Sequence, residues 1–313
     1  MISFFKSFIS NKNPQKFVKI ITYNRFKIKD IVINFSDFSK LYNDFDIKEL
    51  FDFYSVFDEF IFDNKKNLYE NILDIFIKNA QNILLKLNLD ENSLKALCIL
   101  SKNDRKRYSI NKFIPHFQAL GIINKLLEKN ILILEKSQEK PIIKNKRQKI
   151  KKELRSYIIQ DKLIFKNQGL RFFFYFVYPN LNLVDEKKYD KLLELIKNNL
   201  ENYQSLIFEF LAKDFLAKKL KVEQVFSFWN YYCEIDLYYH ENGFCVLGEA
   251  KFKERKICKN ILNILKNKAK QLQIQPNLFV LFSKSGFSKE LVLNKERNLL
   301  LYTLDDFKFL LKE

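Results

Sequence analysis

Four side chains between residues 209 and 251 have the types and spacing that suit metal-dependent hydrolysis. Three are carboxylates, Glu209, Asp236 and Glu249, and the fourth is the ammonium group of Lys251. Two converging carboxylates suit one hard divalent cation that keeps water in its shell. A lysine beside them can hold or help deprotonate that water near a phosphodiester, while the cation stabilises the charge that develops on the phosphate. The chemistry indicated is phosphodiester hydrolysis.

The segment over residues 233–252 predicts a β-hairpin. Strand-like residues run up to Tyr239 and resume at Phe244, with the turn-forming sequence His240–Gly243 between them. Gly243 supplies the positive φ that such turns require.

This hairpin is expected to bring three of the four groups together. Side chains alternate along a strand, so Asp236 lies on one face of the first strand, and Glu249 and Lys251 share one face of the second. Folding about residues 241–242 is expected to place Asp236 opposite position 247. Glu249 is then its diagonal neighbour, within reach of a shared ion.

The fourth group lies on a helix expected over residues 205–220. This helix is apolar nearly all round its first turns, with Glu209 in the middle. A carboxylate held among apolar side chains is costly unless it is paired or binds a cation. A basic helix over residues 255–272 and a strand over 278–282 follow the hairpin. This ordered set is far more informative than the tripeptide Glu249-Ala250-Lys251 alone.

Residues 91–137 predict three short helices followed by a strand. The helices are expected over residues 93–102, from Ser109 onward, and over 118–129, and the strand over 131–134. This is the outline of a winged helix-turn-helix, in which the third helix enters a major groove and the strand begins the wing. An ordinary three-helix module, or one that mediates only protein contacts, has the same outline. The basic residues that fit phosphate contacts here are Lys102, Arg105, Lys106, Arg107 and Lys125.

The remaining segments carry no recognisable chemistry. Residues 1–90 predict short strands over 17–23 and 31–35, then helices over 46–62 and 68–87. A basic connector over residues 137–155 joins the winged-helix segment to the C-terminal region.

Composition favours a folded protein that binds polyanions. The 313 residues include 55 Lys+Arg and 37 Asp+Glu, a net charge of +18, and 47% are hydrophobic, which excludes general disorder. Residues 135–156 hold nine basic and three acidic side chains, and residues 251–270 hold eight basic and one acidic. Such clustering is expected of a nucleic-acid binder, although a solvated lysine-rich face in the lysine-rich proteome of an A+T-rich genome gives the same excess.

A membrane protein and a zinc protein are not expected. The longest apolar run, Phe172–Tyr178, is far shorter than a spanning helix, and no cleavable leader is recognised. The cysteines lack CxxC spacing, which favours thiols in the cytoplasm. They are Cys98, Cys233, Cys245 and Cys258.

Residues 198–313 resemble the PD-(D/E)XK, or restriction-endonuclease-like, superfamily. More narrowly, the chain resembles the uncharacterised nuclease-like domain at the C-terminus of archaeal-type ATPases, where a winged helix precedes that domain. The stretches that carry this likeness are LRFFFYFVYPN (170–180), FWNYYCEIDLYY (228–239), GEAKF (248–252) and LFSKSGFSKEL (281–291). No phosphate-binding G-x-x-x-x-G-K-[ST] motif is present, so no ATPase is expected, and Ile235 replaces the proline of the family name.

The resemblance implies roles for individual residues. Asp236 and Glu249 would bind Mg²⁺ or Mn²⁺, with the carbonyl of Ala250 as a third ligand. Lys251 would activate water or contact phosphate, and Glu209 would be an auxiliary acid. Further nucleic-acid contacts are expected from the basic window after the hairpin, through Lys253, Arg255 and Lys256.

The sequence therefore predicts a mainly helical module (1–90), a winged helix (91–137), a connecting segment (138–197) and an α/β nuclease-like domain with a central mixed sheet flanked by helices (198–313). The expected function is a metal-dependent DNA endonuclease acting on double-stranded DNA. The alternative is a catalytically inactive DNA-binding or adaptor protein that uses the nuclease-like domain for docking. A homodimer or a protein partner is expected to form through residues 1–90.

Overall fold

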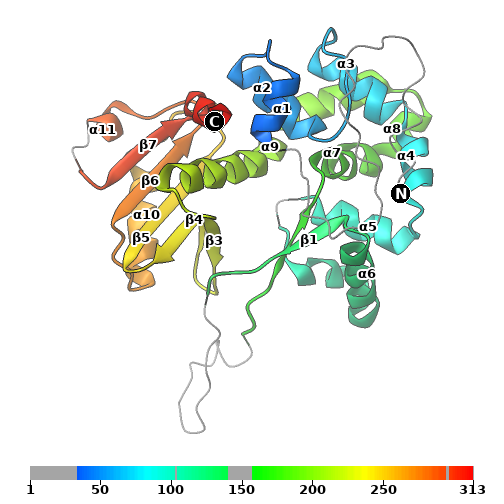
Figure 1. The fold of residues 1–313 in the computed structure, drawn as a ribbon. Helices are drawn as coiled ribbons and strands as arrows, with labels where there is room; N and C mark the ends of the chain where they lie inside the picture. Colours follow the sequence, from blue (N-terminus) through cyan, green and yellow to red (C-terminus); the bar gives the residue numbers. More distant parts are fainter. Residues whose placement is uncertain (1–33, 103, 140–156, 294–295, 313) are drawn as a thin grey trace.

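The computed structural model describes residues 34–102, 104–139, 157–293 and 296–312 (Figure 1). It is a mixed α/β structure with a mainly helical N-terminal part and a C-terminal five-stranded mixed sheet with helices. The strand expected over residues 17–23, most of that over 31–35 and most of the basic connector lie outside the described residues. Phe35, expected at the end of a strand, instead begins a helix.

The N-terminal helices begin where polar side chains can cap them. Asn34, Asp46 and Asn67 each accept a main-chain N–H from the first turn of the helix that follows, which satisfies donors that a helix start leaves free. The elements are α1 (Phe35–Leu41), α2 (Ile47–Phe57), α3 (Leu68–Ile72), the π-helical turn η2 (Leu73–Ile77) and α4 (Ala80–Leu87). The two expected helical regions are confirmed, although the first ends at Phe57 rather than residue 62.

The next segment has three helical pieces and a strand in the expected order. They are α5 (Glu91–Leu100), the 3-10 helix η3 (Arg107–Lys112), α6 (His116–Glu128) and β1 (Leu132–Glu135). The strand β2 (Lys162–Phe165), which follows the connector, pairs antiparallel with β1. The middle piece is thus a 3-10 helix, and the expected strand belongs to a two-stranded sheet.

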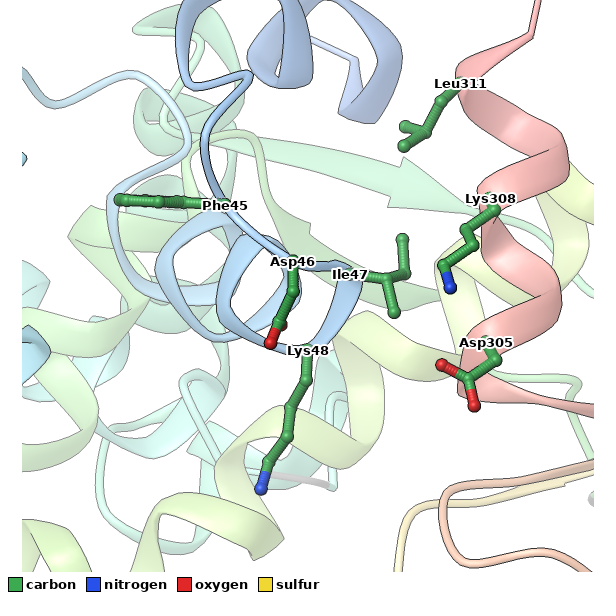
Figure 2. A pocket seen from close by; sticks show the side chains of 7 residues that line it. All are labelled: Phe45, Asp46, Ile47, Lys48, Asp305, Lys308 and Leu311. Atoms are coloured by element: carbon green, nitrogen blue, oxygen red, sulfur yellow. The ribbon is translucent and has the colours of Figure 1, made fainter.

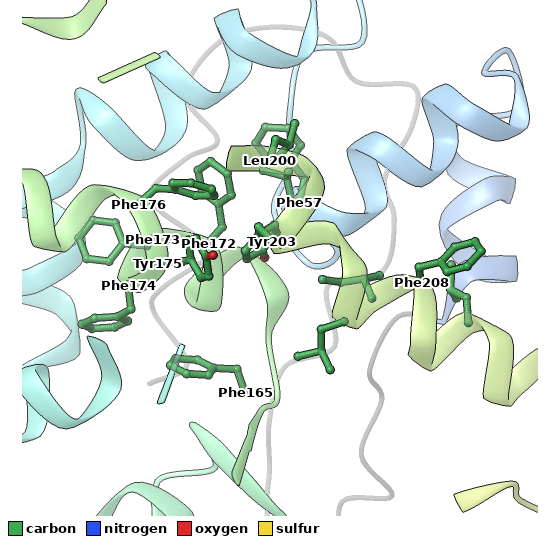
Figure 3. Close-up of a cluster of buried hydrophobic side chains, with 14 of the residues drawn as sticks. Phe57, Phe165, Phe172, Phe173, Phe174, Tyr175, Phe176, Leu200, Tyr203 and Phe208 are labelled. Atoms are coloured by element: carbon green, nitrogen blue, oxygen red, sulfur yellow. The ribbon is translucent and has the colours of Figure 1, made fainter. Parts of the chain in front are cut away.

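An aromatic segment and one long helix link this part to the C-terminal sheet. The elements are α7 (Gln168–Phe172), the π-helical turn η5 (Phe173–Val177), η6 (Tyr178–Asn180), α8 (Leu181–Asp185) and α9 (Tyr189–Leu220). The 172–177 run is fully enclosed in the helical core (Figure 3). Because α9 is continuous over 32 residues, the boundary expected between residues 197 and 198 falls inside a helix.

The C-terminal sheet has the strand order β3-β4-β5-β6-β7. The pairs β3–β4 and β4–β5 are antiparallel, and the pairs β5–β6 and β6–β7 are parallel. The strands are β3 (Phe226–Trp229), β4 (Glu234–Glu241), β5 (Phe244–Lys251), β6 (Leu278–Ser283) and β7 (Leu299–Thr303); the remaining helices are α10 (Lys259–Gln271), α11 (Lys289–Val292) and the 3-10 helix η7 (Leu304–Leu311).

Two helices cover opposite faces of this sheet (Figure 1). On one face, Leu237 and Phe282 join a cluster with residues of α9, and on the other, Leu247 joins a cluster with Leu262 and Leu265 of α10. The sheet edges and hairpin ends between these two layers are therefore the places where polar side chains can gather.

The cluster on the α9 face is continuous with the N-terminal helical part. The ring of Phe51 on α2 lies 6.1 Å from that of Phe208 on α9 and 4.9 Å from that of Phe252, just after β5. The described part of the 1–90 region is therefore packed into the same core as the sheet. Among the described residues, no helix is long and apolar enough to cross a bilayer.

Candidate active site

The hairpin formed by β4 and β5 places two of the predicted acids, Asp236 and Glu249, directly opposite each other on neighbouring strands. The strands pair Leu237 with Gly248, and extending this register by one residue brings Asp236 opposite Glu249. The expectation that Asp236 lies opposite position 247 was wrong, because the two turn residues are 242 and 243, both with positive φ, rather than 241 and 242.

An irregularity in β4 changes the direction of its side chains at Asp236. Phe226 of β3 pairs with Tyr238, but Phe228 pairs with Ile235, so β4 has one extra residue between these pairs. Such a bulge breaks the strict alternation of a strand and re-aims the side chain within it. Ile235 and Tyr238 accordingly both pack against the α10 side of the sheet.

Asp236, Glu249 and Lys251 form one connected cluster. Lys251 Nζ lies 3.4 Å from Asp236 Oδ2 and 2.7 Å from Glu249 Oε1. The main-chain N–H of Ala250 donates to Asp236 Oδ2 at 3.0 Å, and Lys268 Nζ on α10 donates to Glu249 Oε2 at 2.9 Å. Each carboxylate is therefore held in place by two donors.

Burial shifts the protonation equilibria of this cluster. Burial and then the neighbouring Glu249 raise the pKa of Asp236 to about 7. Burial alone would lower the pKa of Lys251, but the adjacent charges of Asp236 and Glu249 outweigh it and raise that pKa above its usual value. Lys251 is thus an ammonium group at neutral pH.

Glu209 lies near enough to this cluster for its charge to help raise the pKa of Asp236, and its own partners are Lys213 and Ser227. Its Oε1 lies 3.0 Å from Lys213 Nζ, one turn further along α9. Ser227 Oγ on β3 lies 3.2 Å from Glu209 Oε1 and 3.1 Å from the main-chain oxygen of Asp236, so its single proton can be donated to only one of them at a time.

A buried chain of charges connects Glu209 to the β1–β2 region. Lys213 Nζ also lies 3.2 Å from Glu135 Oε1 on β1, and Arg105 Nη1 lies 3.0 Å from Glu135 Oε2. Burial opposes ionisation of Glu209, but the charges of Lys213 and Arg105 hold its pKa below the usual value. This pairing explains how the apolar stretch over residues 206–212 of α9 accommodates a carboxylate.

The oxygen donors of the cluster suit a divalent cation, although they come from two acids, Asp236 and Glu249, and not from the three that were expected to gather. No group of three or more His, Cys, Asp or Glu side chains within the described ranges is arranged to hold a metal ion. Asp236 and Glu249 nevertheless present hard oxygen donors, and the charge of Glu249 helps to raise the pKa of Asp236, a repulsion that a bound cation would relieve. Mg²⁺ and Mn²⁺ accept two carboxylates and complete their shells with water. The Ala250 carbonyl remains a predicted third ligand.

Three of the basic residues expected to contact phosphate are already engaged within the protein. Arg105 is buried against the carboxylate described above, and Lys125 lies 2.6 Å from Asp90. Lys102 donates to the main-chain oxygen of Tyr175 at 2.9 Å and lies over its ring. The expectation was wrong for Arg105, whose side chain is buried in an ion pair. Lys102 is exposed and Lys125 is half-buried, so phosphate contact by these two lysines stays a prediction.

The other predicted contacts remain accessible. Lys106 is exposed and Arg107 is half-buried, both at the start of η3. Lys253, Arg255 and Lys256 are exposed and follow β5 directly, a few residues beyond Lys251. A positively charged, exposed segment therefore follows the cluster directly along the chain.

Sequence reasoning missed three residues of this site. Lys213 carried a signal, because a lysine four residues after a glutamate pairs with it on a helix. Ser227 and Lys268 carried none, since each reaches the cluster from a different strand or helix.

A separate hollow lies away from this cluster, between the start of α2 and η7 (Figure 2). None of its lining residues was predicted to be functional. They are Phe45, Asp46, Ile47, Lys48, Asp305, Lys308 and Leu311.

Residues 173–269 match the family model DUF234, which is described as archaea bacterial proteins of unknown function. The DUF234 match runs from η5 through α9 and β3–β5 into α10, so it includes Glu209, Asp236, Glu249 and Lys251. No curated protein and no solved structure was found to match the chain.

Proposed function

We propose that the protein is a metal-dependent nucleic-acid phosphodiester hydrolase whose active site is the cluster of Asp236, Glu249 and Lys251. One observation carries this proposal: a single ammonium group contacts two converging carboxylates on adjacent strands, beside an exposed basic segment. The five-stranded mixed sheet between α9 and α10 supports assignment to the restriction-endonuclease-like folds.

The residues of the cluster have distinct tasks in this proposal. When bound by Asp236 and Glu249, Mg²⁺ or Mn²⁺ would supply an acidified water and positive charge beside the phosphate. The Ala250 N–H and the Lys268 ammonium orient the two carboxylates. Lys251, being protonated, contacts the phosphate and stabilises its developing negative charge.

Glu209 is a positioning residue in this scheme. It contacts Ser227, which in turn lies against the main-chain oxygen of Asp236 in the bulge of β4. We propose that Glu209 supports the backbone that presents the Asp236 carboxylate.

The segment from α5 to β2 is proposed as a winged helix that tethers the protein to double-stranded DNA. Its support is the order of three helical pieces and a two-stranded antiparallel sheet. Lys106 and Arg107 would contact the phosphate backbone there, and Lys253, Arg255 and Lys256 would do so beside the active site. The four cysteines are free thiols, which agrees with a location in the reducing cytoplasm.

A plasmid-nicking assay tests the hydrolase. We expect wild type to convert supercoiled plasmid to the open-circular form with Mg²⁺ or Mn²⁺, and chelation to stop the reaction. Asp236→Ala and Lys251→Ala should each lower the rate by at least about 100-fold. Lys308→Ala, an exposed lysine on η7, is the control.

A catalytically inactive DNA-binding protein is the second candidate. The observation in its favour is that Lys251 and Lys268 already neutralise the two carboxylates. If the wild type shifts DNA in a gel but cleaves neither DNA nor RNA with any divalent metal, this candidate replaces the hydrolase.

A further inference from the structure

Two phenylalanines are exposed to solvent, Phe113 at the end of η3 and Phe117 in the first turn of α6. The side chain of Phe117 is 88% exposed and that of Phe113 is 72% exposed. The ring centroids of His116 and Phe117 lie 5.6 Å apart, and those of Tyr108 and His116 lie 5.9 Å apart. We call Tyr108, Phe113, His116 and Phe117 the aromatic face.

This face is not explained by packing. The buried side of α6 is formed by Ala119, Ile122, Ile123 and Leu126, so Phe117 adds nothing to the core. Exposed apolar side chains that cluster on a folded protein mark a binding surface more often than single ones do.

The charge around the aromatic face selects its ligand. Lys106 and Lys112 are exposed and Arg107 is half-buried. The sequence contains no acidic residue from position 105 to position 127. A positively charged surface with accessible aromatic rings is the combination that binds single-stranded nucleic acid, because rings stack on bases while cations contact the backbone.

Stacking requires bases whose faces are free. In a duplex each base face is covered by its neighbours, and a phenyl ring has no donor for phosphate or for base edges. We propose that the aromatic face binds unpaired bases, stacking them on Phe113 and Phe117 while Lys106 and Lys112 contact phosphate. Resting on the proposed function, this makes the substrate a nucleic acid with a single-stranded segment beside its duplex.

Binding measurements separate this inference from catalysis. Fluorescence anisotropy would compare three probes on the Asp236→Asn protein: a labelled 20-nucleotide strand, the same strand built of abasic sites, and the 20-base-pair duplex. We expect the normal strand to bind more tightly than the abasic one, which has the phosphates without the bases. Phe113→Ala and Phe117→Ala should each weaken single-strand binding by about 5- to 100-fold. Phe117→Tyr should restore most of it.

Leu85→Ala is the matched control, since Leu85 on α4 is 76% exposed and lies outside the face. Equal affinity of the normal and abasic strands overturns the inference, as does unchanged binding by both phenylalanine variants. Such a result with plasmid nicking intact would overturn this inference and leave the hydrolase proposal standing. If the wild type does not nick plasmid but still binds single strands in a base-dependent way, the hydrolase proposal fails and this inference stands.

Discussion

Asp236 Oδ2 accepts a hydrogen bond of 3.0 Å from the main-chain N–H of Ala250 on the neighbouring strand. The carboxylate is thus fixed by the backbone of the segment that also carries Glu249 and Lys251. Because both strands of the hairpin are central in the sheet, this geometry is held by pairing on both sides.

The first prediction concerns cation binding. Adding Mg²⁺ or Mn²⁺ at about 100 times its dissociation constant should stabilise wild type by about 2.7 kcal/mol, which is a rise in Tm of several degrees. Asp236→Asn removes a charged donor, so the rise should disappear in differential scanning fluorimetry. Asp305→Asn, at an exposed position, should keep it. An equal rise in Asp236→Asn would exclude this site.

The second prediction distinguishes the two lysines. Lys251 forms ion pairs with both carboxylates, Asp236 and Glu249. Of these two carboxylates, Lys268 pairs with Glu249. Lys251→Met should lower kcat by about 100- to 1000-fold, and Lys251→Arg should lose less because the positive charge remains. Lys268→Met should lower kcat by about 10-fold, because it removes a group that only orients Glu249. Equal losses for the two methionine variants would contradict direct phosphate contact by Lys251.

The third prediction concerns the buried charge chain. Lys213→Met leaves Glu135 and Glu209 without their shared ammonium group and should lower the free energy of unfolding by about 3 kcal/mol. Adding Glu209→Gln to it should recover much of that loss, because Glu209 is then neutral and Glu135 keeps its ion pair with Arg105. Urea unfolding of the two single variants and the double variant measures this. Additive losses would mean that Lys213 and Glu209 do not interact.

The fourth prediction is a pH dependence. Burial, and then Glu59, raise the pKa of Asp58 from 3.8 to about 7, although Asp58 accepts the N–H groups of Gln168 and Gly169. A carboxyl with a higher pKa in the folded state binds its proton more tightly there. Its stabilising contribution is therefore full below about pH 4 and is lost as the pH rises through 7.

Asp58→Asn should remove this dependence. The stability of wild type relative to the variant should fall by on the order of 2–4 kcal/mol between pH 4 and pH 8. Urea unfolding at several pH values measures it, with the exposed Asp44→Asn as control. A wild-type advantage that grows with pH would show that Asp58 is instead stabilised as the carboxylate.

The fifth prediction compares two glycines. A Cβ on Gly248, in β5, would lie 2.9 Å from the main-chain oxygen of Val280 and 3.1 Å from Leu237. Gly248→Ala should therefore destabilise by about 1–3 kcal/mol. Gly121, inside α6, has no heavy atom within 4 Å of such a Cβ, and Gly121→Ala should stabilise by about 0.5–1 kcal/mol. If neither substitution changed the Tm in thermal unfolding, the close contacts described around Gly248 and the open space around Gly121 would be contradicted.

Much of the helical part was predictable because its signals are local. The local sequence predicted helices near those found at α2 and α3–α4. Thr303 and Asp306 form a capping box at the start of η7. This local signal does not reveal that η7 is a 3-10 helix rather than an α-helix. Both helix types accept the same cap, and packing decides how tightly the turn winds.

The sequence alone determined which side chains could meet on the hairpin. Asp236, Glu249 and Lys251 are joined by a short turn, so alternation along two strands suffices to predict that they meet. Only the tertiary structure decided their register, the bulge at Asp236 and the pairing of Glu209 with Lys213 and, through it, with Glu135. Those contacts depend on how separate helices and strands pack, and long-range ion pairs leave no periodic trace in a sequence. For the same reason, burial removed Arg105 from the expected phosphate contacts.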